Sequence, residues 1–288
     1  MTEPLKIHCH PKLSAPQVVV GFAGWMDGGE VSTGVVEYLT ERMDARLLAE
    51  IAPENFYIYN FPGSMEMSAL FRPEVQIDEG LVTSYEEPEN LFHYDDQHNL
   101  IFFSGKEPNI HWDGFAEQFF SLLETFQARE IIFVGSVTGV VPHTRPPRLY
   151  GAVSDRTLME VLERHDLRPS NYEGPASFST SLMMRARARN MRMTALVTEV
   201  PPYVQGRNIM CIEAVSKKLA AMLGASIDMR DLAPLRKEFE HRLDDLVAEQ
   251  EELRDLVQKM EKDYDEERRE EILTDVQSWF EKQDIQFD

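Results

Sequence analysis

Cysteine is scarce in this sequence of 288 residues, which contains only Cys9 and Cys211. Two cysteines cannot form a disulfide framework, so the sequence indicates a reducing compartment, and we expect both to be small buried side chains. No uninterrupted apolar run reaches the roughly 18 to 20 residues that span a bilayer. These two absences predict a cytoplasmic protein without a membrane partner.

Basic residues are also few. The chain has 29 lysines and arginines against 50 aspartates and glutamates, and its formal net charge is −21. Such a chain repels the phosphate backbone of nucleic acids, so we expect no nucleic-acid partner. The length allows one large domain with a smaller appendage.

The common signatures of enzymes and cofactor sites are missing. The glycine-rich turn at residues 21–29 matches neither Gly-x-Gly-x-x-Gly nor the phosphate loop, because no lysine follows its glycines. Ser136 lies one position too early for the Gly-x-Ser-x-Gly elbow of hydrolases. His8 and His10 would share one face of a strand, but no third metal ligand is indicated. We therefore expect no metal and no cofactor.

What the sequence does contain is a strand, a turn and a helix in direct succession. Residues 18–29 read Val-Val-Val-Gly-Phe-Ala-Gly-Trp-Met-Asp-Gly-Gly, and an amphipathic helix is predicted over residues 30–43. Backbone N–H groups at such a helix start can hold an anion. We expect Asp27 to cap this helix, with a bond to a sugar hydroxyl as the alternative. We expect Trp25 to be a buried anchor, with stacking on a base as the alternative. The turn residues of this candidate site are Gly24, Trp25, Asp27, Gly28 and Gly29.

Apolar strands alternate with amphipathic helices through most of the chain, which predicts an α/β core domain over residues 1–230. Continuous apolar runs at residues 99–105 and 130–137 are typical of strands that are covered on both faces. Two weaker strands, at residues 75–77 and 81–85, are separated by turn residues and predict a hairpin.

The loop at residues 138–148 concentrates His143, Arg145 and Arg148 in an otherwise acidic chain. Its three prolines exclude a helix, while arginine offers a planar fork of donors for phosphate or carboxylate and histidine titrates near neutral pH. These three side chains complete the candidate ligand or anion site. The alternative is that the arginines pair with acidic neighbours or with the C-terminal segment.

Composition changes near residue 231, where a strongly acidic segment begins. We expect residues 231–288 to form a helical appendage. Its apolar residues recur at alternating spacings of three and four, with Gln250 as the one polar interruption, and this predicts the heptad seam of a coiled coil. The seam must be buried against itself, the core domain or another subunit. It consists of Leu243, Leu246, Gln250, Leu253, Val257, Met260 and Tyr264.

Three motifs carry a resemblance to a known family. They are Gly21-Phe-Ala-Gly-Trp-Met-Asp-Gly-Gly, Gly139-Val-Val-Pro-His-Thr-Arg-Pro and Glu199-Val-Pro-Pro-Tyr-Val. In this order they resemble the proteasome assembly chaperone 2 family, in the version of its bacterial members. The resemblance implies a nucleoside-phosphorylase-like fold, which is a three-layer α/β sandwich with a central mixed sheet. Eukaryotic members assemble the 20S proteasome, and some archaeal relatives dock on the proteasome through a C-terminal tail.

The chain ends in Gln286, Phe287 and Asp288, which match such a docking tail in part, because Phe287 stands where the tail has tyrosine. We therefore expect a non-enzymatic protein-interaction or assembly factor. Its partner would be a second copy of the chain or a proteasome-like particle, and a homo-oligomer, specifically a trimer, is predicted. The alternative is an enzyme or binder of a small phosphorylated or nucleoside-like ligand at the glycine turn and the arginine loop.

Overall fold

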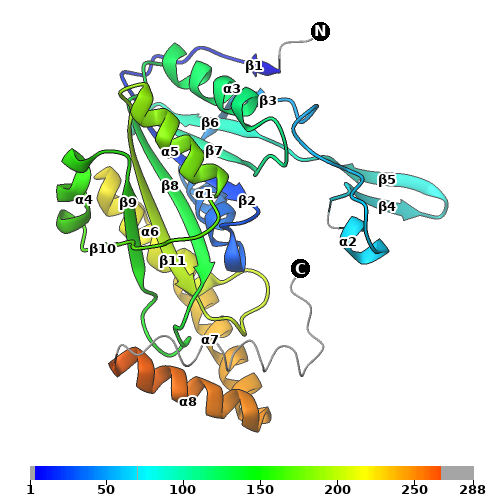
Figure 1. Cartoon of the computed structure of the whole chain (residues 1–288), viewed down its shortest axis with the longest axis vertical. Helices are drawn as coiled ribbons and strands as arrows, with labels where there is room; N and C mark the ends of the chain where they lie inside the picture. Colours follow the sequence, from blue (N-terminus) through cyan, green and yellow to red (C-terminus); the bar gives the residue numbers. More distant parts are fainter. Residues whose placement is uncertain (1–3, 70, 267–288) are drawn as a thin grey trace.

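A sheet of nine strands forms the centre of the computed structural model, which describes residues 4–69 and 71–266 (Figure 1). Two further strands, β4 (Glu74–Asp78) and β5 (Leu81–Glu86), pair only with each other. The strands of the central sheet are β1 (Leu5–Ile7), β2 (Gln17–Ala23), β3 (Arg46–Ile51), β6 (Leu91–Asp95), β7 (Leu100–Lys106), β8 (Glu130–Thr138), β9 (Leu149–Val153), β10 (Arg168–Pro169) and β11 (Arg192–Val200).

The order of the strands across the sheet is β1-β3-β6-β7-β2-β8-β11-β9-β10. The four central strands are parallel: β2 lies between β7 and β8, and β11 follows β8. The flanking strands β6 and β9 run antiparallel to their central neighbours, so the sheet is mixed. The predicted mixed sheet is therefore confirmed, and its parallel centre has the apolar strands that burial on both faces requires.

The helices connect the central strands or follow them. They are α1 (Val31–Arg42), α2 (Met65–Ala69), α3 (Trp112–Thr125), α4 (Met159–Arg164), α5 (Phe178–Ala188), α6 (Ile209–Leu223), α7 (Leu232–Glu249) and α8 (Glu251–Glu266), with short 3-10 turns at Gly28–Glu30 and Arg156–Leu158.

Helices cover both faces of the sheet (Figure 1). On one face, α3 and α5 bury a cluster of aromatic side chains against β2, β7 and β8, and its rings meet in edge and tilted geometries. On the other face, α1 and α6 pack their aliphatic side chains on the same strands. The aromatic cluster includes Phe22, Phe103, Phe115, Phe119 and Phe178. This arrangement is the three-layer sandwich that the sequence predicts.

The sequence predicted one continuous heptad seam in the C-terminal segment. This prediction is wrong in one respect, because the helix breaks at Gln250. This residue has φ −120° and ψ 111°, which ends α7, and α8 begins with the next residue. Four of the seven seam residues are buried against the core of the same chain, Leu246 and Tyr264 are half-buried, and Gln250 is exposed. Leu243 of α7 lies beside Met210, and Leu253, Val257 and Met260 of α8 pack with other apolar side chains around Val140 and Tyr203. Within residues 231–266 the seam is thus covered without a second subunit.

Figure 1 places α7 and α8 below the carboxyl ends of β8 and β11. The hairpin of β4 and β5, which the sequence predicts, projects sideways from the molecule, to the right in Figure 1, together with α2. The division into a core domain and an appendage at residue 230 stays a prediction. The predicted docking tail, residues 286–288, lies outside the described residues.

Candidate functional site

The glycine turn follows β2 at the carboxyl edge of the parallel strands, where open α/β sheets commonly bind ligands. Its backbone is tied to β8, since the N–H of Ser136 donates to Met26 O at 2.9 Å and Ser136 Oγ donates to Gly28 O at 2.7 Å. Gly29 has φ +63°, and a Cβ placed there would lie 2.9 Å from Asn208 Cβ. The glycine at this position thus permits close packing against the start of α6.

Trp25 is not the buried anchor that the sequence predicts, because 65% of its surface is exposed. Its side chain extends from the turn, while its backbone N–H donates to Glu107 Oε2 at 3.0 Å. The other oxygen of this carboxylate accepts from Phe178 N at 2.7 Å. Glu107 therefore holds the turn by its backbone, while the indole is exposed at the surface.

Asp27 caps the first turn of α1, as predicted, although the residue next to the helix is Glu30. Its carboxylate accepts from Thr33 N at 3.1 Å and from Thr33 Oγ1 at 2.8 Å. Burial raises the pKa of Asp27 to about 6, against the lowering effect of these hydrogen bonds. Both oxygens are already used inside the chain, so this geometry does not favour a bond to a sugar.

In the arginine loop, His143 and Arg148 are buried and bonded within the chain. His143 Nδ1 lies 2.7 Å from Tyr203 Oη, and His143 Nε2 lies 3.2 Å from Asp244 Oδ1. The guanidinium of Arg148 lies 4.2 Å from the ring centre of Tyr264 in α8 and donates to the backbone oxygen of that residue at 3.1 Å. These two side chains therefore connect the core to the C-terminal helices.

Arg145 lies at the surface and faces α8. Its Nη2 donates to Asp265 Oδ2 at 3.0 Å and its Nε to Asp265 Oδ1 at 3.1 Å, which is a two-pronged ion pair. Glu261 lies 3.4 Å from Arg145 Nη1. These contacts agree with the alternative interpretation of the loop, in which its arginines pair with the C-terminal segment.

The glycine turn and the arginine loop share one edge of the sheet, but they line no cavity together among those found in the described residues. A space of about 10 Å³ lies between the arginine loop and α6 and has room for one water at most. A cleft of about 430 Å³ opens between the loop, α6 and α7. Its charges are paired with each other: Glu213 lies 2.6 Å from Lys217 and 3.3 Å from Arg236. Neither of these two spaces is lined by a residue of the glycine turn, and a common site of the turn and the loop stays a prediction.

Five of the exposed large apolar side chains among the described residues lie on the β4–β5 hairpin, to which the sequence assigned no function. The register pairs Val75 with Tyr85 and Ile77 with Val82. These four side chains and Leu81 are 55% to 69% exposed. Contiguous apolar side chains on a surface typically mark a contact with another protein. Their alternation in two predicted strands was the available signal.

The hairpin is inserted between β3 and β6, and its base is closed by Asn90. The side chain of Asn90 donates to Ile51 O at 3.2 Å, and Tyr57 Oη donates to Asn90 Oδ1 at 2.7 Å. Beside this base runs a groove of about 1180 Å³, which is lined by α1 on one side and by β6 and β7 on the other. Its acidic lining residues are Glu37, Glu41, Glu50, Glu54, Glu86, Glu87 and Glu89. The groove is also lined by one basic residue, Lys106.

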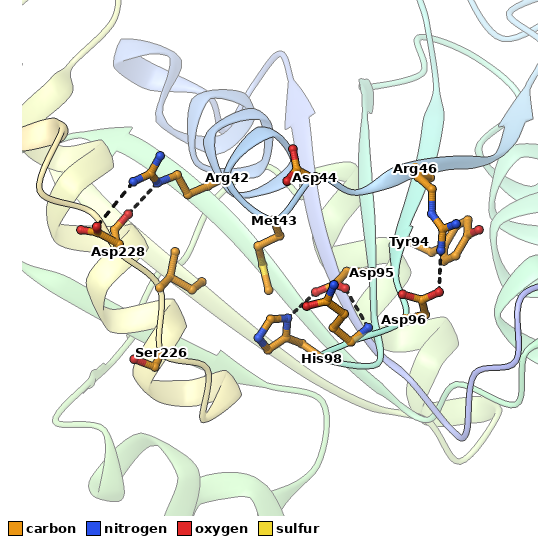
Figure 2. Close-up of a pocket in the computed structure, with 12 residues that line it drawn as sticks. Arg42, Met43, Asp44, Arg46, Tyr94, Asp95, Asp96, His98, Ser226 and Asp228 are labelled. Carbon is orange, nitrogen blue, oxygen red and sulfur yellow. Dashed lines mark hydrogen bonds and ion pairs between the residues drawn. The ribbon is translucent and has the colours of Figure 1, made fainter.

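A further pocket of about 610 Å³ lies at the opposite edge of the sheet, beyond the end of α1 (Figure 2). Figure 2 shows its charged side chains paired: Arg42 faces Asp228, Arg46 faces Asp96 at 2.5 Å, and His98 faces Asp95 at 2.5 Å. Because each of these cations already has an acidic partner, the pocket does not favour an anionic ligand.

Within residues 4–69 and 71–266 no three histidine, cysteine, aspartate or glutamate side chains are placed to hold a metal ion. His8 instead lies 3.6 Å from Glu50. Over the same residues, every helix is too short or too polar to cross a bilayer.

Solved structures share this fold. A protein of unknown function from Mycobacterium tuberculosis superposes with a TM-score of 0.80 at 22% identity, covering 96% of this chain and 92% of its own. A proteasome-assembly chaperone homologue from the same organism gives 0.72 at 21% identity, covering 83% and 98%. An archaeal proteasome activator from Pyrococcus furiosus gives 0.61 at 23% identity, covering 84% and 97%. At these identities the likeness concerns the fold alone.

The sequence itself was compared with curated proteins and with protein families. No curated protein matches it. The PAC2 family matches residues 21–247, which contain the glycine turn, the hairpin, the arginine loop and most of α7. This protein therefore belongs to the PAC2 family.

Proposed function

We propose that this protein is a non-enzymatic protein-interaction factor with an assembly role, and that the β4–β5 hairpin is its partner surface. The observation that carries the proposal is the row of apolar side chains that the hairpin exposes. An isolated two-stranded ribbon is marginally stable in water, so a hairpin of this kind gains most from a surface that covers it. Similar structures include a proteasome-assembly chaperone homologue and an archaeal proteasome activator, and this likeness supports a protein partner.

The carboxyl edge of the sheet supports the same conclusion by a different route. A small-molecule site needs a cavity of roughly 300 Å³ or more with free polar groups. At the arginine loop the cleft of that size has its charges neutralised by neighbours, and His143 and Arg148 are buried. The alternative function, binding of a phosphorylated or nucleoside-like ligand, therefore has less support than the protein partner.

The test replaces apolar hairpin residues by a charged one. A double variant, Ile77→Asp with Leu81→Asp, changes one exposed residue on each strand, and Leu235→Asp makes the same kind of change on the exposed side of α7. The probes are the 20S proteasome of the source organism and its separated subunits, and complexes are measured by size-exclusion chromatography with light scattering. We expect the wild type and Leu235→Asp to form a complex and the double variant to lose it.

Light scattering on the protein alone also measures self-association through the hairpin. A wild-type mass above that of one chain that falls to one chain in the double variant would identify a second copy as the partner. A double variant that binds the probes and self-associates like the wild type would contradict the assignment of the hairpin.

A further inference from the structure

The surface that receives α8 has an apolar floor and a cationic rim. The floor is formed by Val140 and Tyr203, which follow β8 and β11. On it lie four buried side chains of α8: Leu253, Leu256, Val257 and Met260. A helix that presents apolar residues at such spacings is the usual occupant of a groove of this kind.

The rim of the surface is complementary to an acidic helix. Arg145 holds Asp265 with two hydrogen bonds, and Thr144 donates to Glu261. Tyr264 Oη donates to Pro146 O at 3.0 Å, and its ring carries the guanidinium of Arg148. The loop at residues 142–148, with Val140 and Tyr203, thus forms a receptor for an acidic amphipathic helix, and we call it the helix receptor.

The connection between α7 and α8 is a single residue. Only Gln250 leaves the helical conformation, while the spacing of apolar residues continues across it: Leu243 and Leu246 before the break are followed by Leu253 and Val257. A change of the dihedral angles at Gln250 would join α7 and α8 into one straight helix with its seam on one side. The joined helix would also gain backbone hydrogen bonds that the break removes.

Straightening has a cost that only a partner can offset. It removes the apolar side chains of α8 from the helix receptor of their own chain, and exposed apolar side chains are unfavourable in water. A second copy offers an identical receptor, so the same contacts can form between two chains.

We propose that the helix receptor is an interaction surface between copies of this chain, in which α8 of one copy docks on the receptor of another after straightening at Gln250. Exchange of an identical element is a low-cost route to a dimer, because the closed and exchanged forms share their contacts. Short hinges favour such exchange. The proposal does not depend on the function of the hairpin.

The first experiment mixes two full-length variants that each carry one new thiol. Thr144→Cys changes the receptor and Glu261→Cys changes α8, at positions whose side chains touch in the closed chain. After the mixture is oxidised, peptide mass spectrometry reads a disulfide between positions 144 and 261 of different chains. The matched control replaces Glu261→Cys by Asp255→Cys, which lies on the exposed side of α8. We expect the interchain product for the first pair and not for the control.

The second experiment alters the hinge. Gln250→Leu completes the apolar seam and removes its polar interruption, so we expect it to raise the interchain product by about tenfold and to shift the mass toward two chains. Gln258→Leu makes the same replacement on the exposed side of α8 and should behave like the wild type. If the mixed chains give no interchain product and Gln250→Leu keeps the wild-type mass at all concentrations, the proposal is wrong.

Discussion

The carboxyl edge of the sheet and the β4–β5 hairpin differ in the exposure of their apolar residues. At the carboxyl edge, α8 buries Leu253 and Met260 completely against the core of its own chain. On the hairpin, Leu81 and Ile77 are mostly exposed. The first region is therefore closed by the chain itself, and the second remains open to another molecule.

This difference shows how the same fold class can serve different functions. In an open α/β sheet the carboxyl edge is the usual position of a ligand site. In this protein, buried side chains, ion pairs and two helices occupy much of that edge, while the exposed apolar surface lies on an insertion. The following predictions test whether the first region is structural and the second is not.

The largest expected effect is the loss of a buried leucine side chain. Leu253→Ala should lower the free energy of unfolding by about 3 kcal/mol, because it removes a fully buried side chain and leaves a cavity. Leu81→Ala, the same replacement on the hairpin, should change it by less than about 0.5 kcal/mol. Urea unfolding measures both. Equal effects at the two positions would show that the regions do not differ as described.

Arg148→Ala comes next, since this side chain joins the core to α8. We expect a loss of about 2 kcal/mol in urea unfolding, because the substitution removes a hydrogen bond from a charged group and the contact with Tyr264. The control is Arg230→Ala, whose side chain is 91% exposed and should leave the midpoint nearly unchanged. An Arg148→Ala variant with the same free energy of unfolding as the wild type would show that this connection does not stabilise the fold.

Asp27 gives a prediction about pH. Its pKa is raised to about 6 in the folded chain, so protonation favours folding, and its contribution is fully present below about pH 3.8 and is lost as pH rises through 6. Asp27→Asn keeps an oxygen that can accept from Thr33 but cannot titrate. The variant should gain about 2 kcal/mol relative to the wild type between pH 4 and pH 7, as measured by urea unfolding.

A second cap tests the sign of this effect. Asp155 accepts from Thr157 N and Oγ1 at the surface, and these hydrogen bonds lower its pKa. Its contribution is present above about pH 3.8 and is lost as pH falls further. Asp155→Asn should therefore be less stable than the wild type near neutral pH. This difference in the free energy of unfolding should vanish only in acid, below the pH range in which Asp27 titrates. A parallel pH dependence of the two variants would contradict the burial of Asp27.

The smallest effect concerns the rim of the helix receptor. Arg145→Ala should lower the free energy of unfolding by less than about 1 kcal/mol, because its ion pair with Asp265 is exposed. The effect should shrink further in 1 M salt. A double-mutant cycle with Asp265→Ala isolates the pair, and a coupling energy above about 2 kcal/mol would show that the rim is as structural as the floor.

The sequence analysis predicted the class of the fold, since continuous apolar strands and amphipathic helices identify a parallel centre that is covered on both faces. It also identified the hairpin from its alternating residues and turn. The break at Gln250 was not predictable, because the heptad pattern continues through it. The bend is explained only by Val140 and Tyr203, which α8 covers. They follow β8 and β11, two strands that are far apart in the sequence and adjacent in the sheet.

The candidate site could be predicted in part. The arginine loop was recognised as unusual, but the residues of α8 that its two arginines contact lie 116 to 120 residues away along the chain. No local pattern shows that Asp265 meets Arg145. Trp25 was wrongly expected to be buried, because a large aromatic residue is usually covered, whereas here only its backbone is held in place, by Glu107.

Asn90 closes the base of the hairpin, and the residues on either side of the insertion, Glu50 and Leu91, are sheet neighbours. The sheet would therefore remain continuous if a tight turn joined β3 directly to β6. We therefore expect that the segment between them can change in length and sequence while the core keeps its register. Under the proposed role of the hairpin, partner specificity would be free to change without a change in the architecture that carries it.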